Sequence, residues 1–267
     1  MSDPPIERPS LRCRPVDLSE RREVDARRHP WEVARARFFR RLIARHVDVG
    51  TLGAVLDVGA GDGWFAGELA DDVSASCRIT CWDVNYSDAD LHVPAHLGGR
   101  IMRTTEPPEG TFDLILLLDV IEHIAKDEQF LRDEITSRMH PRSRLVVSVP
   151  AYQRLYSHHD VALGHERRYG PSQLRRLLAP HLVIDEHGGL FTSLLAPRMV
   201  ALVLERAGRS PDEAGIGRWE RGSVVTTTLT ALLDADARGG AWLGRRGIAV
   251  PGLSTWALCR LPETHLL

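Results

Sequence analysis

The chain has 267 residues, of which 43% are apolar and 26% charged, so neither a disordered nor a membrane-embedded protein is indicated. Its 34 basic and 36 acidic residues leave a formal net charge of -2, which gives no overall attraction for a polyanion such as nucleic acid. The four cysteines show no repeated CxxC spacing and no apolar leader opens the chain, so we expect a cytoplasmic protein.

The first 30 residues predict a flexible N-terminal arm. They are rich in proline and charge and have little apolar periodicity from which to build a core. From Trp31 onward, apolar residues recur at helical spacing, which predicts an amphipathic helix. We expect residues 31–267 to form a single domain.

The following segment alternates short apolar runs with helical patterns, as βαβ units do. Its central runs are apolar on consecutive positions, which is typical of parallel strands that are covered on both faces. We predict strands at 54–58, 78–82, 100–103, 112–118 and 144–149, with helices at 64–69 and 121–139.

A polar insertion at 151–170, rich in His and Arg, interrupts this alternation. Such long insertions are more often functional than structural. After it we predict helices at 171–178, 194–206 and 219–237 and strands at 181–187 and 253–261. The apolar stretch 190–204 falls short of the ~20 residues that cross a bilayer, so peripheral contact with a membrane is the most that it allows.

A glycine-rich turn follows the first predicted strand. Gly59, Gly61 and Gly63 have GxGxG spacing, whereas a dinucleotide-binding fingerprint requires GxGxxG, and this argues against NAD. Glycines in such a turn let the backbone approach a ligand closely. Asp83 ends the second strand, 20 residues after Gly63, where a carboxylate can accept hydrogen bonds from both ribose hydroxyls of an adenosyl group.

The pattern Asp57-x-Gly59-x-Gly61-x-Gly63 followed by Asp83 resembles the S-adenosylmethionine (SAM) signature of class I methyltransferases. Residues 112–124 are similar to a segment of the ubiquinone-biosynthesis-like branch of that superfamily, and the similarity covers about Trp31 to the C-terminus. The resemblance implies an α/β, doubly wound, mostly parallel sheet of seven strands. Residues 247–259 resemble its antiparallel last strand.

The resemblance also implies a set of cofactor-binding residues. Asp57, Gly59 and Gly61 would line the methionine side of SAM, with Gly63 completing the turn, and Asp83 would hold the ribose. Leu118 and Asp119 would lie where the cofactor approaches the substrate. The chain has Pro141-Arg142-Ser143 where the family usually has Pro-Gly-Gly, and its adenine-side loop is short, so we assign no adenine contact.

Methyl transfer to an oxygen or carbon acceptor requires removal of a proton, and histidine is suited to this near neutral pH. Residues 156–169 resemble a WSxHDxxxGHxRRY stretch of uncharacterised bacterial methyltransferases and follow the fifth strand, where they would roof the substrate pocket. The candidate catalytic residues are His159, Asp160, His165 and His123, and which histidine is the base stays open.

Two further readings concern the same region. Asp119, Glu122 and His123 resemble the acid-acid-histidine metal motif of some quinone-type O-methyltransferases, but this spacing also arises whenever a charged helix follows a strand, so we assign no metal ligands. Arg167 and Arg168 could clamp an anionic group of the substrate or pair with surface acids.

The sequence therefore predicts a SAM-dependent methyltransferase that acts on a small-molecule acceptor. The alternative is a non-catalytic SAM-binding module that interacts with a partner through the same fold. Retention of Asp83, the full glycine turn and the polar insertion favour the enzyme. The acceptor and the oligomeric state are left open.

Overall fold

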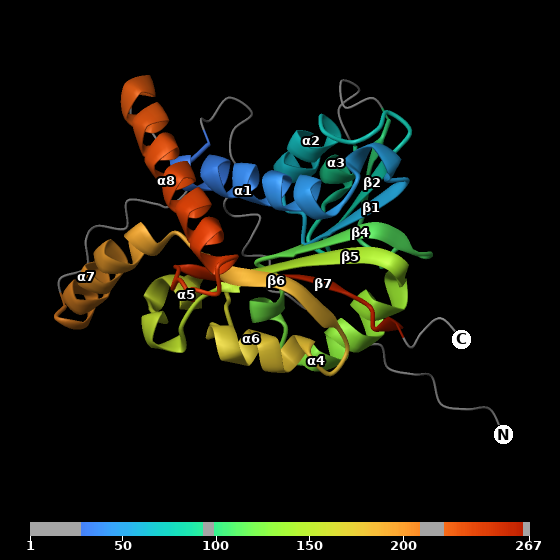
Figure 1. Cartoon of the computed structure of the whole chain (residues 1–267). Coiled ribbons are helices and arrows are strands. Elements are labelled where there is room, and N and C mark those ends of the chain that lie inside the picture. The colour runs from blue at the N-terminus through green and yellow to red at the C-terminus, as the bar shows by residue number, and fades with distance from the viewer. Residues whose placement is uncertain (1–27, 93–98, 209–221, 264–267) are drawn as a thin grey trace.

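The computed structural model describes residues 28–92, 99–208 and 222–263. Its centre is a seven-stranded sheet with the strand order β3-β2-β1-β4-β5-β7-β6 (Figure 1). The neighbouring strands from β3 to β5 pair in parallel, and β7 is antiparallel to both β5 and β6. The strands are β1 (Ala54–Val58), β2 (Arg78–Trp82), β3 (Ile101–Thr104), β4 (Phe112–Leu118), β5 (Met139–Pro150), β6 (Val183–Leu190) and β7 (Ser254–Arg260).

Helices cover both faces of this sheet, which confirms the doubly wound fold with an antiparallel last strand (Figure 1). The face under α1, α2 and α8 forms one apolar core, and the face under α4 and α6 forms a second. The helices are α1 (Pro30–His46), α2 (Trp64–Ala70), α3 (Asp88–Leu91), α4 (Asp127–Phe130), α5 (His158–Ala162), α6 (Pro171–Leu178), α7 (Leu195–Arg206) and α8 (Ser223–Gly244).

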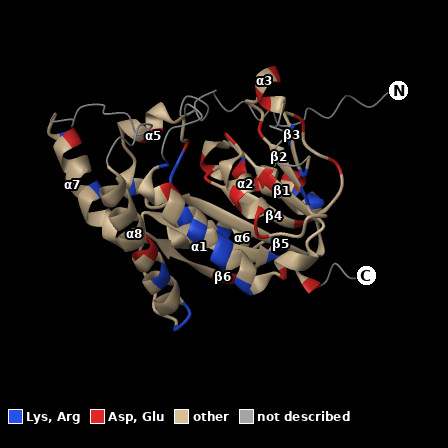
Figure 2. Cartoon of the chain, turned by 90° about the horizontal axis from the view of Figure 1, so that it is seen from above, with Lys and Arg blue, Asp and Glu red and all other residues tan. Residues whose placement is uncertain are grey.

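Helix α1 begins at a capping box and contacts both α2 and α8. The His29 side chain accepts a hydrogen bond from the Trp31 nitrogen, the Glu32 carboxylate accepts one from the His29 nitrogen, and Pro30 occupies the first turn. Arg40 binds Glu68 at 2.7 Å and Asp72 at 2.6 Å, so basic residues of α1 face acidic ones around α2 (Figure 2). The helix predicted from Trp31 is thus confirmed, whereas the expected arm falls almost wholly on residues outside the described part.

The helix predicted at 121–139 is wrong in its continuity. The segment forms a 3-10 turn (Ile121–His123), then α4, then a π turn (Leu131–Ile135) and a second 3-10 turn (Thr136–Arg138), and β5 already begins at Met139. Hydroxyl groups end the helical stretch, because Thr136 and Ser137 bond the carbonyl groups four residues earlier. The helix predicted at 219–237 instead runs over Ser223–Gly244, and residues 219–221 are not described.

Pro141 lies inside β5, where a proline would not be expected in a central strand. The register with β4 shifts between Phe112 and Leu114, and the Ser143 hydroxyl spans this irregularity by donating to the Phe112 carbonyl oxygen at 2.5 Å. A bulge of this kind tolerates a residue without an N–H group. The sequence Pro141-Arg142-Ser143 therefore lengthens β5 rather than preceding it.

None of the helices in the described ranges is long and apolar enough to span a bilayer.

A close crossing of backbone holds the ends of β6 and β7 together. A Cβ atom added at Gly252 would lie 2.1 Å from the Leu190 nitrogen, so alanine there forces the two segments apart. We expect Gly252→Ala to lower the free energy of unfolding by about 2–3 kcal/mol. Gly239→Ala, in α8 with nothing within 4 Å of the added atom, should raise it by ~0.5–1 kcal/mol.

Urea denaturation of the two variants beside the wild type measures both changes. If Gly252→Ala is as stable as the wild type, the backbone at the β6–β7 crossing can move apart without loss of stability.

Candidate active site

A cavity of about 470 Å³ lies at the carboxyl ends of β1, β4 and β5. This is where ligands bind in open α/β sheets, and the volume lies within the range of small-molecule pockets. Its wall combines the glycine turn, the start of α1, the polar insertion and the start of α7. Segments far apart in the sequence therefore meet around one space.

The glycine turn has left-handed backbone at three positions. The φ angles are 63° at Gly59, 55° at Gly61 and 76° at Gly63, a region that glycine enters without steric penalty. An added Cβ atom at Gly59 would lie 2.6 Å from Val120, whereas one at Gly61 would meet nothing within 4 Å. Gly59 and Gly61 line the cavity and Gly63 does not. The open side of Gly61 is thus room for a ligand.

The predicted ribose-binding acid lies behind this turn. Asp83 is 5% exposed and does not line the cavity; its carboxylate accepts hydrogen bonds from the Gly61 and Asn85 backbone, each at 2.9 Å. In this conformation Asp83 shapes the glycine turn. A ribose would therefore share the carboxylate with these backbone groups.

Asp57, at the end of β1, is buried beside Asp83. Burial, followed by repulsion from Asp83, raises the pKa of Asp57 to about 7, although the guanidinium of Arg35 acts against this. A cationic ligand at this corner would favour the ionised form. SAM carries both an ammonium and a sulfonium group, so this corner fits its methionine end.

Leu118 and Asp119 continue the cavity wall at the end of β4. Asp119 has a φ of 59°, which is uncommon outside glycine and carries strain of ~1–3 kcal/mol. Arg35 of α1 forms an ion pair with its carboxylate at 2.9 Å, and Ser148 donates to it at 3.3 Å. The role of Arg35 was not predicted from the sequence, because its ion pair joins α1 to the end of β4, a contact between distant segments.

Asp160, in α5, is the centre of the polar insertion. It is fully buried and accepts hydrogen bonds from Ser157 nitrogen at 2.9 Å, His165 Nδ1 at 2.8 Å and Arg168 Nε at 2.6 Å. Burial opposes its ionisation, but the bonds from His165 and Arg168 hold the pKa of Asp160 well below its usual range. Asp160 lies behind the cavity wall and fixes residues that line it.

Three of the histidines line the cavity: His123, His159 and His165. The rings of His123 and His165 meet edge to face with their centroids 4.7 Å apart. Burial, and then the neighbouring His165, lower the pKa of His123 to about 4, and burial lowers that of His159 against the opposing charge of Asp160. Both rings are therefore neutral at neutral pH.

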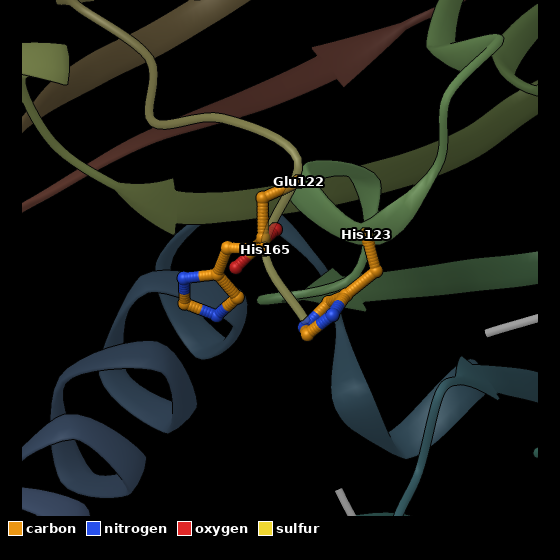
Figure 3. Close-up of side chains that lie close together, drawn as sticks. All are labelled: Glu122, His123 and His165. Atoms are coloured by element: carbon orange, nitrogen blue, oxygen red, sulfur yellow. The ribbon is translucent and has the colours of Figure 1, made fainter. Parts of the chain in front are cut away.

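The cluster of possible metal ligands differs from the sequence motif. Glu122, His123 and His165 lie together, whereas the motif contained Asp119, which Arg35 engages instead (Figure 3). His165 joins the cluster from the insertion, 42 positions further along the chain than His123. Sequence spacing within one turn could not have indicated such a partner.

The predicted arginine clamp is occupied by protein partners. Arg167 binds Asp127 at 2.8 Å, as the alternative of pairing with an acid at the surface predicts. Arg168 instead forms a buried ion pair with Asp160. Arg198 of α7, which was not predicted as a site residue, lines the cavity, donates to Ser157 and lies 3.8 Å from Asp160. It ties α7 to the insertion.

Residues 29–208, more than half of the chain, match a family model described as a methyltransferase domain. The chain belongs to the methyltransferase domain family. SAM is accordingly its methyl donor, and the activity predicted from the glycine turn and Asp83 is confirmed at this level. The match does not distinguish the branch, so the ubiquinone-biosynthesis-like branch stays a prediction.

Solved structures share the fold of this methyltransferase at low sequence identity. The N-methyltransferase NodS from Bradyrhizobium japonicum WM9, in complex with S-adenosyl-L-homocysteine, is 15% identical, with 88% of this chain and 89% of that chain covered and a TM-score of 0.50. The 4+2 cyclase SpnF is 18% identical over 90% and 86%, with a TM-score of 0.52. The plantazolicin methyltransferase BpumL is 10% identical over 88% and 85%, also at 0.52. No curated protein sequence matches the chain.

The raised pKa of Asp57 predicts a pH-dependent stability change in the ligand-free protein. Because the folded-state pKa of about 7 exceeds the ordinary aspartate value of 3.8, the folded protein favours the protonated acid, and this contribution to stability is lost as the pH rises through about 7. We expect Asp57→Asn to be more stable than the wild type at pH 8 by ~2–4 kcal/mol, at about 1.4 kcal/mol per pKa unit.

At pH 4 the two proteins should unfold at nearly the same urea concentration. A constant difference at both pH values would show that packing, rather than the charge of Asp57, sets the effect.

Proposed function

We propose that this methyltransferase transfers the methyl group of SAM to a small-molecule acceptor held between the glycine turn and the His-rich insertion. The observation that carries this proposal is that one cavity is lined by both segments, with Gly59 and Gly61 on one side and His159 and His165 on the other. The 470 Å³ volume suits a cofactor and a small acceptor rather than a macromolecule. SAM supplies a methyl group activated by its sulfonium charge.

On the cofactor side, Asp57, Gly59 and Gly61 bind the methionine portion and Asp83 binds the ribose while it supports the turn that ends at Gly63. Leu118 and Asp119 line the passage from cofactor to acceptor. The ion pair with Arg35, at 2.9 Å, orients the Asp119 carboxylate. This arrangement orients the donor, which is the main requirement of an in-line displacement.

On the acceptor side, His159 accepts the proton that an oxygen or carbon acceptor must lose. It lines the cavity, and its lowered pKa keeps the imidazole in the neutral form that can take up a proton. The charged and titratable groups that act on it are Asp160, Arg198, His165 and Arg168. His165, anchored by Asp160, and His123 position the acceptor beside it.

The charge and the cysteines of the chain bear on its partner and its location. With a net charge of -2, the chain offers no general attraction for nucleic acid, so we propose a metabolite-sized acceptor. Cys77, Cys81 and Cys259 are free and buried, which is in keeping with a reducing cytoplasm. The segment 151–170 acts as the roof of the acceptor pocket.

Cofactor binding is tested first by calorimetric titration with SAM and with S-adenosylhomocysteine. Gly61→Ala places a methyl group in the open side of the turn and should weaken both ligands by at least ~10-fold, a loss of about 1.4 kcal/mol. Gly99→Ala is the matched control, because Gly99 also has a positive φ and open space around it but does not line the cavity. Equal losses in both variants would mean that backbone strain, not occupancy, weakens binding.

The role of His159 is tested with a radiolabelled methyl group and a panel of hydroxyl and carbon acids as acceptors. His159→Gln should reduce the transfer rate by ~10²–10⁴-fold, as expected for loss of a general base, and leave SAM affinity unchanged. His158→Gln, with a side chain 90% exposed, is the neighbouring control and should transfer at the wild-type rate. SAM binding without transfer to any acceptor would favour the non-catalytic module.

A further inference from the structure

A carboxylate and two imidazoles converge beside the acceptor end of the cavity. Glu122, His123 and His165 each offer a ligand atom, and these atoms all lie within 4.8 Å of one another (Figure 3). Glu122 is fully buried, and both histidines line the cavity. The cluster therefore has one protected side and one side that a small molecule can reach.

The backbone brings these side chains together through direct links between the insertion and the turn after β4. The Glu166 nitrogen donates to the Glu122 carbonyl oxygen at 2.8 Å, and the Tyr169 hydroxyl donates to the Ile121 carbonyl oxygen at 3.3 Å. The Tyr156 hydroxyl holds the His165 carbonyl oxygen at 2.6 Å. These hydrogen bonds to main-chain carbonyl groups hold both segments that carry Glu122, His123 and His165.

The orientation of His165 is fixed from behind. Asp160 accepts the hydrogen of Nδ1 at 2.8 Å, which leaves Nε2 as the nitrogen that can coordinate an ion. A carboxylate that orients the far nitrogen is the usual support of a metal-bound histidine. Asp160 is itself held by Ser157 and Arg168, so this support is rigid.

We propose that Glu122, His123 and His165 bind one divalent transition-metal ion of the zinc type. Two imidazoles with one carboxylate match the three protein ligands of a zinc site that keeps one open position. Imidazole donors select such ions over magnesium and calcium, which prefer oxygen. The three side chains would hold the ion through one carboxylate oxygen and two imidazole nitrogens.

This inference rests on the proposed function and deepens it. His123 and His165 both border the cavity, so the open coordination position faces the acceptor. A cation held there would lower the pKa of an acceptor hydroxyl group that coordinates it. His159 would take up the hydroxyl proton while the oxygen forms its bond to the methyl carbon and the bond from that carbon to the SAM sulfur breaks, which leaves S-adenosylhomocysteine. The acceptor class is accordingly a small molecule methylated on a hydroxyl oxygen.

The first test measures metal binding alone. The full-length protein is stripped with a chelator, titrated with Zn²⁺ by calorimetry, and loaded with Co²⁺ to record the absorption of a tetrahedral site. We expect one ion per chain in the wild type, and affinities at least ~100-fold weaker in His123→Gln and in His165→Gln, because each removes a ligand. Circular dichroism checks that the variants are folded.

Two control variants separate this site from the proposed chemistry. His158→Gln, with its exposed side chain, and His159→Gln, which alters the cavity but not the ligand set, should both bind Zn²⁺ as the wild type does. Absence of stoichiometric binding by the wild type overturns the inference, and so does wild-type affinity in folded His123→Gln and His165→Gln. A wild-type protein that binds Zn²⁺ but not SAM would instead contradict the proposed function and leave the metal site supported.

Discussion

The parallel pairing of β1 with β4 is the constraint on which the site depends. It places the end of β1, with Asp57 and the glycine turn, next to the end of β4, with Leu118 and Asp119. Adjacent parallel strands end at the same edge of a sheet, so these residues border one cavity. β5 adds the insertion at that edge, because its own carboxyl end lies beside β4.

Three acidic residues at the cavity, Asp57, Asp119 and Asp160, differ in how their charge is balanced. Asp119 and Asp160 have guanidinium partners, and their charges hold α1 and the insertion in place. Asp57 has a raised pKa, because burial and Asp83 outweigh Arg35. The ion pairs of Asp119 and Asp160 thus stabilise the cavity wall. A cationic ligand would be most strongly favoured beside Asp57, whose charge is the least balanced.

Local sequence signals predicted the strands and the glycine turn well, since consecutive apolar residues, glycine spacing and a terminal acid are all short-range features. The lengths of the helices were less predictable: side-chain hydroxyls of Thr136 and Ser137 end a stretch whose apolar periodicity continues. The contacts of Arg35 and Arg198, and the proximity of Glu122 to His165, could not be predicted from the sequence. They depend on tertiary contacts between α1, α7, the insertion and the turn after β4, which no spacing within one segment encodes.

Helix α1 has a consequence for the order in which the protein can be completed during synthesis. It precedes the sheet in the chain, yet it packs against α8 near the C-terminus, with Arg41 bound to Asp234 at 2.5 Å. A ribosome-bound chain that lacks α8 therefore exposes the apolar side of α1 that α8 covers in the folded protein. The order of synthesis thus leaves the apolar side of α1 uncovered until α8, the last of the described helices, has emerged.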